Sequence, residues 1–339
     1  MAKPKISPVV WRPPATVPDS PTTIDNLHVH PLPGTGGEDV LVDESGRVIT
    51  GLDDGRVLRF DPETGRIRQL AETGGRPLGL EWLPDGRLLI CDADRGLLAA
   101  EVSDAGPPAT LADGRLTVLV RTVAHTPVRI CNNAAVARDG TIWFTDSSAR
   151  FDLEHWKADI IEHSGTGRLL RRDPDGRCEV VADRLQFANG VALTADEDAL
   201  YFAETGNYTV SKLHLTGVRS GQREVLSPVL PGFPDNLATG TDGRIWVAIA
   251  SPRNKLLDAL GPRSPVLRKM VWALPEAAQP KPAHLTEVLA IDPTTDLIDA
   301  AYAGEDPVFG VSTGVREHHG TVWLGSLTAG AIASFVLPD

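Results

Sequence analysis

A strand–turn–strand pattern occurs six times along this chain, and it constrains the possible fold more than any other feature. In each copy, about six apolar or alternating residues lead to a Gly or an acidic pair, after which Val, Ile, Leu, Trp or Tyr resume. Such a pattern is typical of β-hairpins. Several copies continue into a third strand, as in "GRVLRFDP" and "TEVLAIDP". The copies begin at Glu38, Leu78, Asn132, Asn189, Asp235 and Thr313.

Repeated strands of period two, at irregular spacings of roughly 40–80 residues, suit the blades of a β-propeller and not a helical solenoid. We therefore predict an all-β protein. We expect a six-bladed β-propeller with four-stranded blades around a central channel and short helical insertions over the channel mouth.

The composition limits the number of domains and the kinds of partner. The chain has 339 residues, 42% of them hydrophobic, and closed β architectures of this length often form one unit. We expect an N-terminal arm over residues 1–25 and a single propeller over residues 26–339. A net charge of −12, without a Lys/Arg cluster in the sequence, argues against nucleic acid as a partner. No segment approaches the roughly 18 apolar residues that a membrane span needs.

The three cysteines are Cys91, Cys131 and Cys178, and their spacing does not match a metal site. All lie in or beside apolar runs, so we expect buried free thiols in a reducing compartment. The sequence therefore predicts a cytoplasmic protein.

The hairpin register brings the starts of the first strands together. If the third hairpin turns at Asp139–Gly140, Arg138 faces Thr141 and Asn133 faces Asp146. The first strand of each propeller blade lines the channel, so all six starts should meet at one rim. Four of the starts carry side-chain oxygens, and they come from four different blades: Glu38, Asn132, Asn189 and Asp235.

Two carboxylates and two amide oxygens are ligands that suit Ca²⁺, whereas zinc prefers His or Cys. We predict one Ca²⁺ in the channel, held by Glu38, Asn132, Asn189 and Asp235, although other divalent cations are possible. Asn133 and Asn236 follow two of these positions and are expected to be additional ligands or to orient the ligands. The alternative is that such Asx residues only cap turns.

Three segments give the chain a family resemblance: "CNNAAVARDGTIWFTDSS", "FANGVALTADEDALYFAET" and "LPGFPDN". They resemble the strictosidine synthase-like branch of the calcium-dependent six-bladed propellers. That superfamily includes gluconolactonases, the senescence marker protein, diisopropylfluorophosphatase and the paraoxonases. The resemblance runs from about residue 36 to the C-terminus. It implies the same fold and places the family's calcium ligands on Glu38, Asn132, Asn189 and Asp235. Asn236 matches a further ligand of the paraoxonase branch.

The chain departs from this family at two catalytic positions. True strictosidine synthases have a catalytic Glu at the start of the sixth blade, where this chain has Thr313. We therefore do not expect a true strictosidine synthase. The paraoxonase-type catalytic His opens the second blade, where this chain has Leu78 and Gly79. Metal-centred hydrolysis needs neither group.

The favoured function is therefore a calcium-dependent hydrolase of a lactone or related ester. Ca²⁺ would polarise the carbonyl, and a water deprotonated by Asp235 or another rim carboxylate would attack it. Asp235 and Glu38 are the catalytic candidates. The alternative is a non-hydrolytic strictosidine synthase-like propeller with a structural calcium, which binds a ligand or acts as a biosynthetic lyase or condensing enzyme.

Two insertions, 147–167 and 251–285, each follow a second strand and precede a third, so we expect them to form a lid over the channel mouth. Their aromatic residues suggest a small, partly apolar substrate. Docking of the second insertion onto a membrane is less favoured, because Lys and Arg are few. The carboxylates that end second strands could line the substrate pocket or could only satisfy turns. The complete set of pocket candidates is Leu78, Asp92, His125, Asp146, Phe151, Trp156, Glu204, Trp272 and Thr313.

Overall fold

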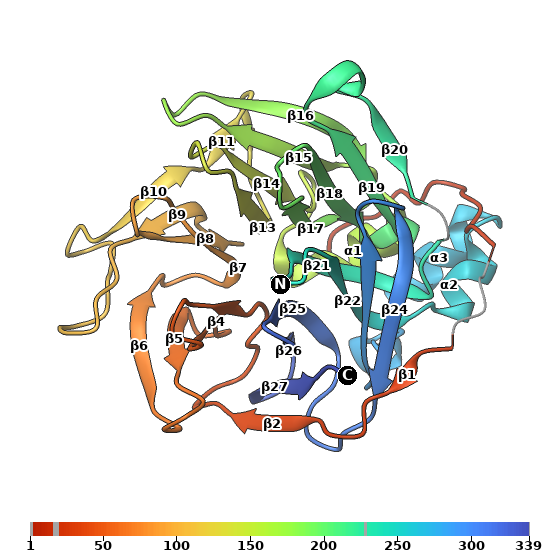
Figure 1. Ribbon diagram of the computed structural model, residues 1–339. Helices are drawn as coiled ribbons and strands as arrows, with labels where there is room; N and C mark the ends of the chain where they lie inside the picture. Colours follow the sequence, from red (N-terminus) through yellow and green to blue (C-terminus); the bar gives the residue numbers. More distant parts are fainter. Residues whose placement is uncertain (1–2, 16–19, 227–228, 339) are drawn as a thin grey trace.

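In the computed structural model, which describes residues 3–15, 20–226 and 229–338, six sheets stand in a ring around a central channel (Figure 1). The predicted six-bladed β-propeller is confirmed. Blades 1 to 3 consist of β3 (Leu41–Val42), β4 (Val48–Gly51), β5 (Arg56–Phe60) and β6 (Ile67–Glu72); β7 (Pro77–Trp82), β8 (Leu88–Asp92), β9 (Gly96–Ala100) and β10 (Leu116–Val120); and β13 (Cys131–Val136), β14 (Ile142–Asp146), β15 (Gly167–Arg172) and β16 (Cys178–Leu185).

Blades 4 to 6 continue the same order from the channel outwards. They consist of β17 (Ala188–Leu193), β18 (Ala199–Glu204), β19 (Thr209–His214) and β20 (Arg223–Val225); β21 (Gly232–Thr239), β22 (Ile245–Pro252), β23 (Thr286–Asp292) and β24 (Leu297–Gly304); and β25 (Ser312–His318), β26 (Thr321–Ser326) and β27 (Ala331–Val336). A small separate hairpin is formed by β11 (Thr122–Val123) and β12 (Thr126–Pro127).

The N-terminal part of the chain closes the ring. β2 (His28–Pro31) pairs antiparallel with β27 and supplies the fourth strand of blade 6. β1 (Thr22–Thr23) adds to blade 5 by parallel pairing with β24. The end of the segment expected as an arm, residues 1–25, is thus part of a sheet, while its residues 1–2 and 16–19 lie outside the described residues.

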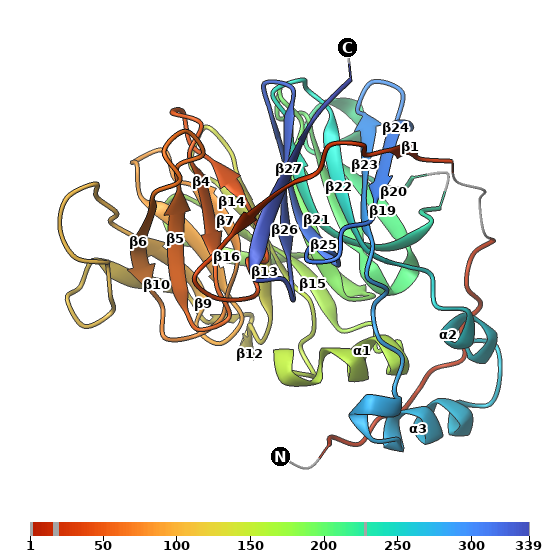
Figure 2. The same cartoon turned by 90° about the horizontal axis from the view of Figure 1, so that it is seen from below.

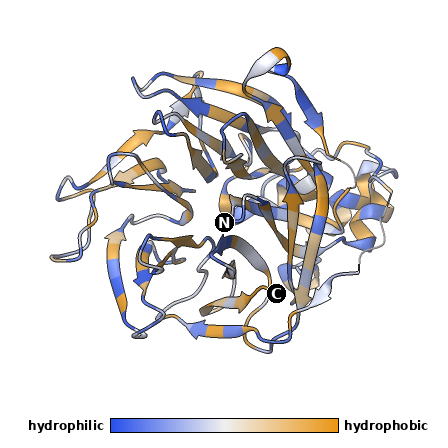
Figure 3. Cartoon of the chain, viewed as in Figure 1, coloured by the Kyte–Doolittle hydropathy of each residue, from blue (hydrophilic) through white to orange (hydrophobic). Residues whose placement is uncertain are grey.

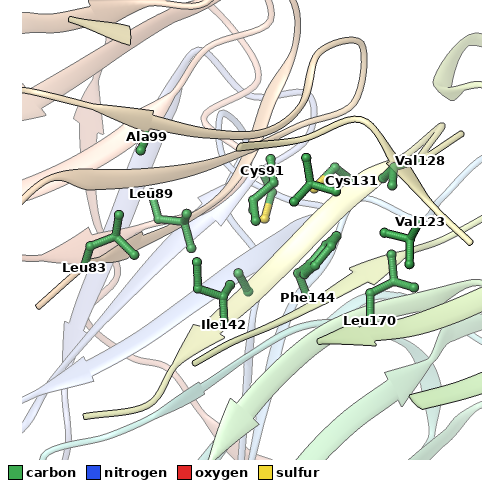
Figure 4. Close-up of a cluster of buried hydrophobic side chains, with 13 residues drawn as sticks. Leu83, Leu89, Cys91, Ala99, Val123, Val128, Cys131, Ile142, Phe144 and Leu170 are labelled. Carbon is green, nitrogen blue, oxygen red and sulfur yellow. The ribbon is translucent and has the colours of Figure 1, made fainter. Parts of the chain in front are cut away.

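The hydrophobic core consists of six layers, one between each pair of neighbouring blades. In the layer between blades 2 and 3, Cys91 of β8 and Cys131 of β13 pack with Phe144 of β14, and both thiols are free (Figure 4). Inner strands contact a neighbour on both faces, so β8 and β14 are buried at every position, whereas β16 at the edge is mostly exposed or half-buried. Figure 3 shows the same difference as more hydrophilic colour on outer strands and turns.

The register of the third hairpin differs from the prediction. Val136, not Arg138, begins the pairing, opposite Ile142, and Ala137 N donates to Thr141 O over 2.8 Å. Gly140, with a φ of 88°, closes the loop in a left-handed conformation that Gly adopts without strain. Cys131 rather than Asn133 therefore faces Asp146.

Both predicted insertions contain short helices, and these lie on one face of the propeller (Figure 2). The first insertion forms α1 (Trp156–Glu162), and the second forms α2 (Lys255–Leu260) and α3 (Pro265–Ala273). Single 3₁₀ turns occur at Leu153–His155, Thr205–Asn207, Gly217–Arg219 and Glu276–Ala278. Among the helices of the described residues, none has the length and apolar character to cross a membrane.

Candidate metal centre and substrate cavity

A β-bulge recurs at the start of the innermost strand in five of the six blades. In each of them the pairing with the second strand shifts across two residues that have no partner. A bulge changes the direction in which side chains leave a strand. The first residue of every unpaired dipeptide lines one common cavity, and Glu38 of blade 1 joins them: Glu38, Leu78, Asn132, Asn189, Asp235 and Thr313.

The second residue of each dipeptide alternates between polar and glycine around the ring: Asp39, Gly79, Asn133, Gly190, Asn236 and Gly314. A Cβ added to Gly79 would lie 2.6 Å from Asn132 O, and one added to Gly314 would lie 2.6 Å from Glu38 O. Neighbouring first strands thus approach so closely that every second blade requires Gly at this position. This close contact brings side chains from different blades together.

Four buried oxygens at this place have no hydrogen-bond partner among the described residues. They are Glu38 Oε2, Asn132 Oδ1, Asn189 Oδ1 and Asn236 Oδ1. Buried polar atoms are normally paired, because each unpaired one costs free energy. Four unpaired acceptors at one end of the channel therefore indicate a site for a positively charged group.

The amide nitrogens of the three asparagines are held by the protein, which leaves their oxygens free. Asn132 Nδ2 donates to Ser147 Oγ over 2.9 Å, and Asn189 Nδ2 donates to Thr205 Oγ1 over 3.2 Å. Asn236 Nδ2 donates to Glu38 Oε1 over 3.1 Å. Within the described residues, no cluster of three His, Cys, Asp or Glu exists, so a cation here would depend on amide as well as carboxylate oxygens. Such a mixed oxygen set suits a hard cation of the Ca²⁺ type.

The two carboxylates of the set are strongly affected by burial. Burial raises the pKa of Glu38 well above its usual range, and the charges of Asp235 and Asp39 raise it further. Burial also raises the pKa of Asp235 to about 7, although a hydrogen bond from Asn189 opposes this shift. Burial likewise raises the pKa of Asp39, the neighbour of Glu38 in the sequence, to about 6. A nearby cation would remove the cost of ionising these groups.

Asn133 and Asn236 differ in what their oxygens do. Asn133 Oδ1 accepts from Val191 N over 3.0 Å, and its Nδ2 lies 3.4 Å from Asp39 Oδ2. Its side chain therefore ties three blades together. Asn236 instead keeps a free Oδ1 beside Glu38, the position of an additional ligand.

The cavity above these oxygens has mainly apolar walls, is open at one side and has a volume of about 120 Å³. Trp156 and Ile160 of α1 and Leu257 of α2 form its cover, so the lid reaches the site through these helices. Phe187 and Val311, each two residues before a first-strand start, line the wall with left-handed φ values of 57° and 56°. The remaining lining residues are Leu153, Lys157, Ile161, Thr205, Phe233, Ala250, Ser251, Asn254, Pro280, Lys281, Pro282 and Leu327.

Of the predicted pocket residues, Leu78, Trp156 and Thr313 line the cavity. Thr313 Oγ1 donates to the backbone oxygen of Glu38 over 2.8 Å, so this position offers no titratable group. Phe151 and Trp272 do not line the cavity but are buried in a small core within the lid. His125 is exposed in the turn of the β11–β12 hairpin and is likewise absent from the lining.

The carboxylates at the ends of second strands are also outside the lining, because they hold the connecting loops. Asp92 Oδ1 accepts from Asp94 N and Arg95 N over 2.9 and 2.8 Å. Asp146 forms a buried ion pair of 2.5 Å with Arg168.

Glu204 accepts from Gln186 N over 2.9 Å and pairs with Arg223. For all three of these carboxylates, the alternative role in satisfying turns agrees with the observed contacts.

Several site residues are absent from the prediction. Ser147 and Thr205, which anchor the amides of Asn132 and Asn189, each directly follow a second strand that ends in an acidic residue. A hydroxyl residue directly after the acidic end of a second strand, and thus next to the predicted rim, could have indicated both of them. Phe187 and Phe233 each lie two residues before a candidate ligand, so the repeat itself could have indicated them.

The fold and the site define a six-bladed propeller with an oxygen-lined centre under an apolar cavity. The chain belongs to the SMP-30/gluconolactonase/LRE-like family, whose model matches residues 49–257. Residues 22–60 also match the N-terminal model of the strictosidine synthase-like proteins.

Relatives in sequence and in structure agree with this assignment. Strictosidine synthase-like protein 13 of Arabidopsis thaliana is 34% identical over 71% of this chain, and the match spans 64% of that protein. The adipocyte plasma membrane-associated protein of Rattus norvegicus is 28% identical, over 86% of this chain and 80% of its own length.

Among solved structures, a gluconolactonase from Xanthomonas campestris has a TM-score of 0.64 at 19% identity, covering 92% of this chain and 89% of its own. The calcium-binding protein regucalcin from Agrobacterium tumefaciens has a TM-score of 0.62 at 16% identity, covering 94% and 95%. At these identities the structures show a shared fold.

Proposed function

We propose that this protein is a calcium-dependent hydrolase of a lactone or related ester whose acyl part is substantially apolar. The observation that carries the proposal is a group of unpaired buried oxygens: those of Glu38, Asn132 and Asn189, which line an apolar cavity, and that of Asn236 beside Glu38. Membership of a family that includes gluconolactonases supports the reaction class.

Glu38, Asn132, Asn189 and Asp235 would hold the cation, with Asn236 as an additional ligand. When bound, Ca²⁺ would polarise the substrate carbonyl and stabilise the negative charge that develops on its oxygen. Glu38 is buried and accepts a hydrogen bond from Asn236, so its role is to hold the cation. Asp235 is only half-buried and lines the cavity, so its carboxylate can accept a proton from an attacking water.

The cavity walls favour the apolar part of the substrate. Trp156, Phe187 and Phe233 provide aromatic surface close to the oxygen set. A polyhydroxylated sugar lactone would leave several hydroxyls without partners against such walls, which costs free energy. An aryl ester or a lactone with an alkyl chain matches the walls better.

A second candidate function is a non-hydrolytic one, in which the calcium is structural and the cavity binds a ligand or serves a lyase or condensing reaction. The strictosidine synthase-like relative, at 34% identity, favours this alternative. Thr313 argues against a strictosidine synthase reaction, because its hydroxyl is bound to a backbone oxygen and cannot act as the general base.

The test combines metal content with turnover. Purified protein is assayed for bound metals and then tested on aryl esters, alkyl lactones, gluconolactone and phosphotriesters, before and after chelation. We expect bound calcium and hydrolysis of apolar esters or lactones, which stops on chelation and returns with Ca²⁺ better than with Zn²⁺. Hydrolysis that survives complete chelation would exclude the metal-centred reaction, and bound calcium without any turnover would favour the second candidate.

A further inference from the structure

Exposed apolar side chains gather on the lid side of the molecule. Among the described residues, sixteen large hydrophobic side chains are exposed, and seven of them belong to two short segments: the N-terminal arm, residues 3–15, and the second insertion, residues 251–285. We call these two segments together the lid surface. Its seven exposed apolar residues are Val9, Val10, Leu256, Val266, Leu267, Met270 and Leu274. Single exposed apolar residues are ordinary, whereas exposed apolar residues that gather in one region are typical of interaction sites.

The α3 helix of the lid surface exposes an apolar face. At about 100° per residue, Val266, Leu267 and Met270 fall within an arc of about 100°, and Arg268 and Trp272 fall on the other side. Arg268 and Trp272 are buried against the protein, whereas Val266 and Met270 are 59% and 62% exposed. A surface helix normally presents polar residues to water. Among the described residues, nothing fully covers the apolar outer face of α3.

The N-terminal arm lies beside α3, against the side that carries Arg268, and adds exposed apolar side chains of its own. Arg268 donates to the backbone oxygen of Val9, and Val9 N donates to Glu162 O over 3.0 Å. Trp11 N donates to Gly261 O, at the end of α2, over 3.1 Å. These contacts place the arm beside α3 and α2, with the Val9 and Val10 side chains 54% and 55% exposed. In Figure 2 the arm and the helices share one face of the propeller.

The lid surface is basic although the protein is acidic. Its two segments contain nine Lys and Arg but only two Asp and Glu, in a chain with a net charge of −12. The single exposed acid of these segments, Glu276, lies 3.4 Å from Lys157 of α1. Nine of the 33 Lys and Arg of the chain thus lie in the two segments that also expose the apolar residues. The exposed cations of the lid surface are Lys3, Lys5, Arg12, Lys255, Arg263, Lys269 and Lys281.

We propose that the lid surface docks onto a lipid bilayer that contains anionic lipids. The apolar side chains of α3 and the arm would enter the boundary between head groups and acyl chains, while the lysines contact lipid phosphates. The low number of cations, which made docking less favoured from the sequence, is offset by their concentration on one face. Docking does not require turnover, so it stands independently of the proposed hydrolase activity.

The lid surface adjoins the cavity, so docking would bring the cavity close to the bilayer. Leu256 is exposed on α2, and the next residue, Leu257, lines the cavity. The same short helix therefore contacts both the proposed bilayer and the proposed substrate. An apolar substrate dissolved in the membrane would meet the apolar cavity wall without first crossing bulk water.

The experiment is flotation of the full chain with vesicles of phosphatidylcholine alone and of phosphatidylcholine mixed with phosphatidylserine, in the presence of chelator. We expect binding to the mixed vesicles, weak binding to phosphatidylcholine alone, and release as sodium chloride is raised. Lys269→Glu should lower the partition coefficient by at least about fivefold, from the usual contribution of one basic residue near an anionic surface. Val266→Asp with Met270→Asp should also abolish most binding.

Matched controls keep the proposal falsifiable. Val308→Asp and Arg184→Glu change exposed side chains outside the lid surface and should leave binding unchanged. Circular dichroism and thermal unfolding verify that each variant is folded. No binding of the folded wild type to the mixed vesicles would overturn the proposal, as would an equal loss in the control variants. A dimer in light scattering that only the lid-surface variants dissociate, without vesicle binding, would instead make this face a subunit interface and would equally overturn it.

Discussion

Two sets of buried or half-buried carboxylates lie near the same rim of the channel, and they differ in the groups that they contact. Asp92, Asp146 and Glu204, at the ends of second strands, accept hydrogen bonds from backbone amides, and Asp146 and Glu204 also pair with arginines. Glu38 and Asp235, at the starts of first strands, have no basic partner within hydrogen-bond distance among the described residues. Because both sets lie near the same rim, closeness to the rim does not distinguish them. Their partners do: the first set holds loops, and the second is free to bind a cation.

The strongest test of this difference is Asp235→Asn, which keeps the size of the side chain and removes its charge. We expect kcat at saturating calcium to fall by about 10³-fold, in the range of a lost general base, and calcium affinity to decrease. Stopped assays and calorimetry measure the two effects. Asp242→Asn, in the turn at the opposite end of the same hairpin, is the control and should change neither. Wild-type calcium affinity and rate in Asp235→Asn would return Asp235 to the role of a turn residue.

The opposite effect is expected for Asp146→Ala. This change leaves the Arg168 guanidinium buried without its carboxylate and removes the acceptor for Arg129 N and Ile130 N. Removal of one partner of a buried pair costs about 3–5 kcal/mol of the free energy of unfolding. Denaturant unfolding gives this value, and calcium affinity of the folded protein should remain within about twofold of wild type, inside ordinary experimental variation. A variant that is as stable as wild type but no longer binds calcium would instead show that Asp146 belongs to the calcium ligands.

Without calcium, the stability of the protein should decrease as the pH rises, and added calcium should abolish this pH dependence. In the metal-free protein, the folded pKa of Asp235 is about 7 and that of Glu38 is also raised, both through burial. The folded state then holds protons that the unfolded chain releases near pH 4, so stability falls as pH rises from about 4 to above 7. We expect the Tm in chelator to decrease from pH 5 to pH 8, and this decrease to disappear with Ca²⁺. Equal slopes with and without calcium would contradict the assignment of these carboxylates.

The smallest effect separates the two neighbouring asparagines. Asn236→Ala removes a free oxygen beside Glu38 and should weaken calcium binding several-fold, whereas Asn133→Ala removes hydrogen bonds to Val191 and Asp39 and should mainly lower stability. The expected loss for Asn133→Ala is about 1–3 kcal/mol, the cost of an unsatisfied buried group. Calcium titration and thermal unfolding of both variants measure the contrast. If both variants lost calcium affinity and stability to the same extent, the assignment of Asn236 as a ligand and Asn133 as a structural residue would be wrong.

The sequence was sufficient for the ring of blades, because each hairpin repeats a local signal that needs no distant contact. It was also sufficient to select the first-strand starts, since their placement follows from the repeat. It could not predict the bulges, because these arise where first strands of neighbouring blades contact each other. A trace of them was nevertheless present in Gly79, Gly190 and Gly314, which follow three of the six starts.

The lid was less accessible to sequence reasoning. Phe151 and Trp272 were correctly assigned to apolar insertions, but composition does not tell which face of an insertion meets the cavity, and both are buried within the lid. His125 lies only seven residues before Asn132, but it occupies the turn of the β11–β12 hairpin and is exposed to solvent. The arm has no periodic pattern, so its contacts with α2 and α3 depend entirely on tertiary structure.

The alternation of polar residues and glycines in the inner ring has a consequence for symmetry. Asp39, Asn133 and Asn236 are separated by Gly79, Gly190 and Gly314, so the smallest unit that repeats around the channel is a pair of blades. The centre therefore has approximate threefold symmetry within a sixfold ring. A ring with an odd number of blades could not preserve this order, since two bulky or two empty positions would become neighbours. Gain or loss of a single blade would thus disrupt the centre, whereas gain or loss of an adjacent pair would keep the alternation intact.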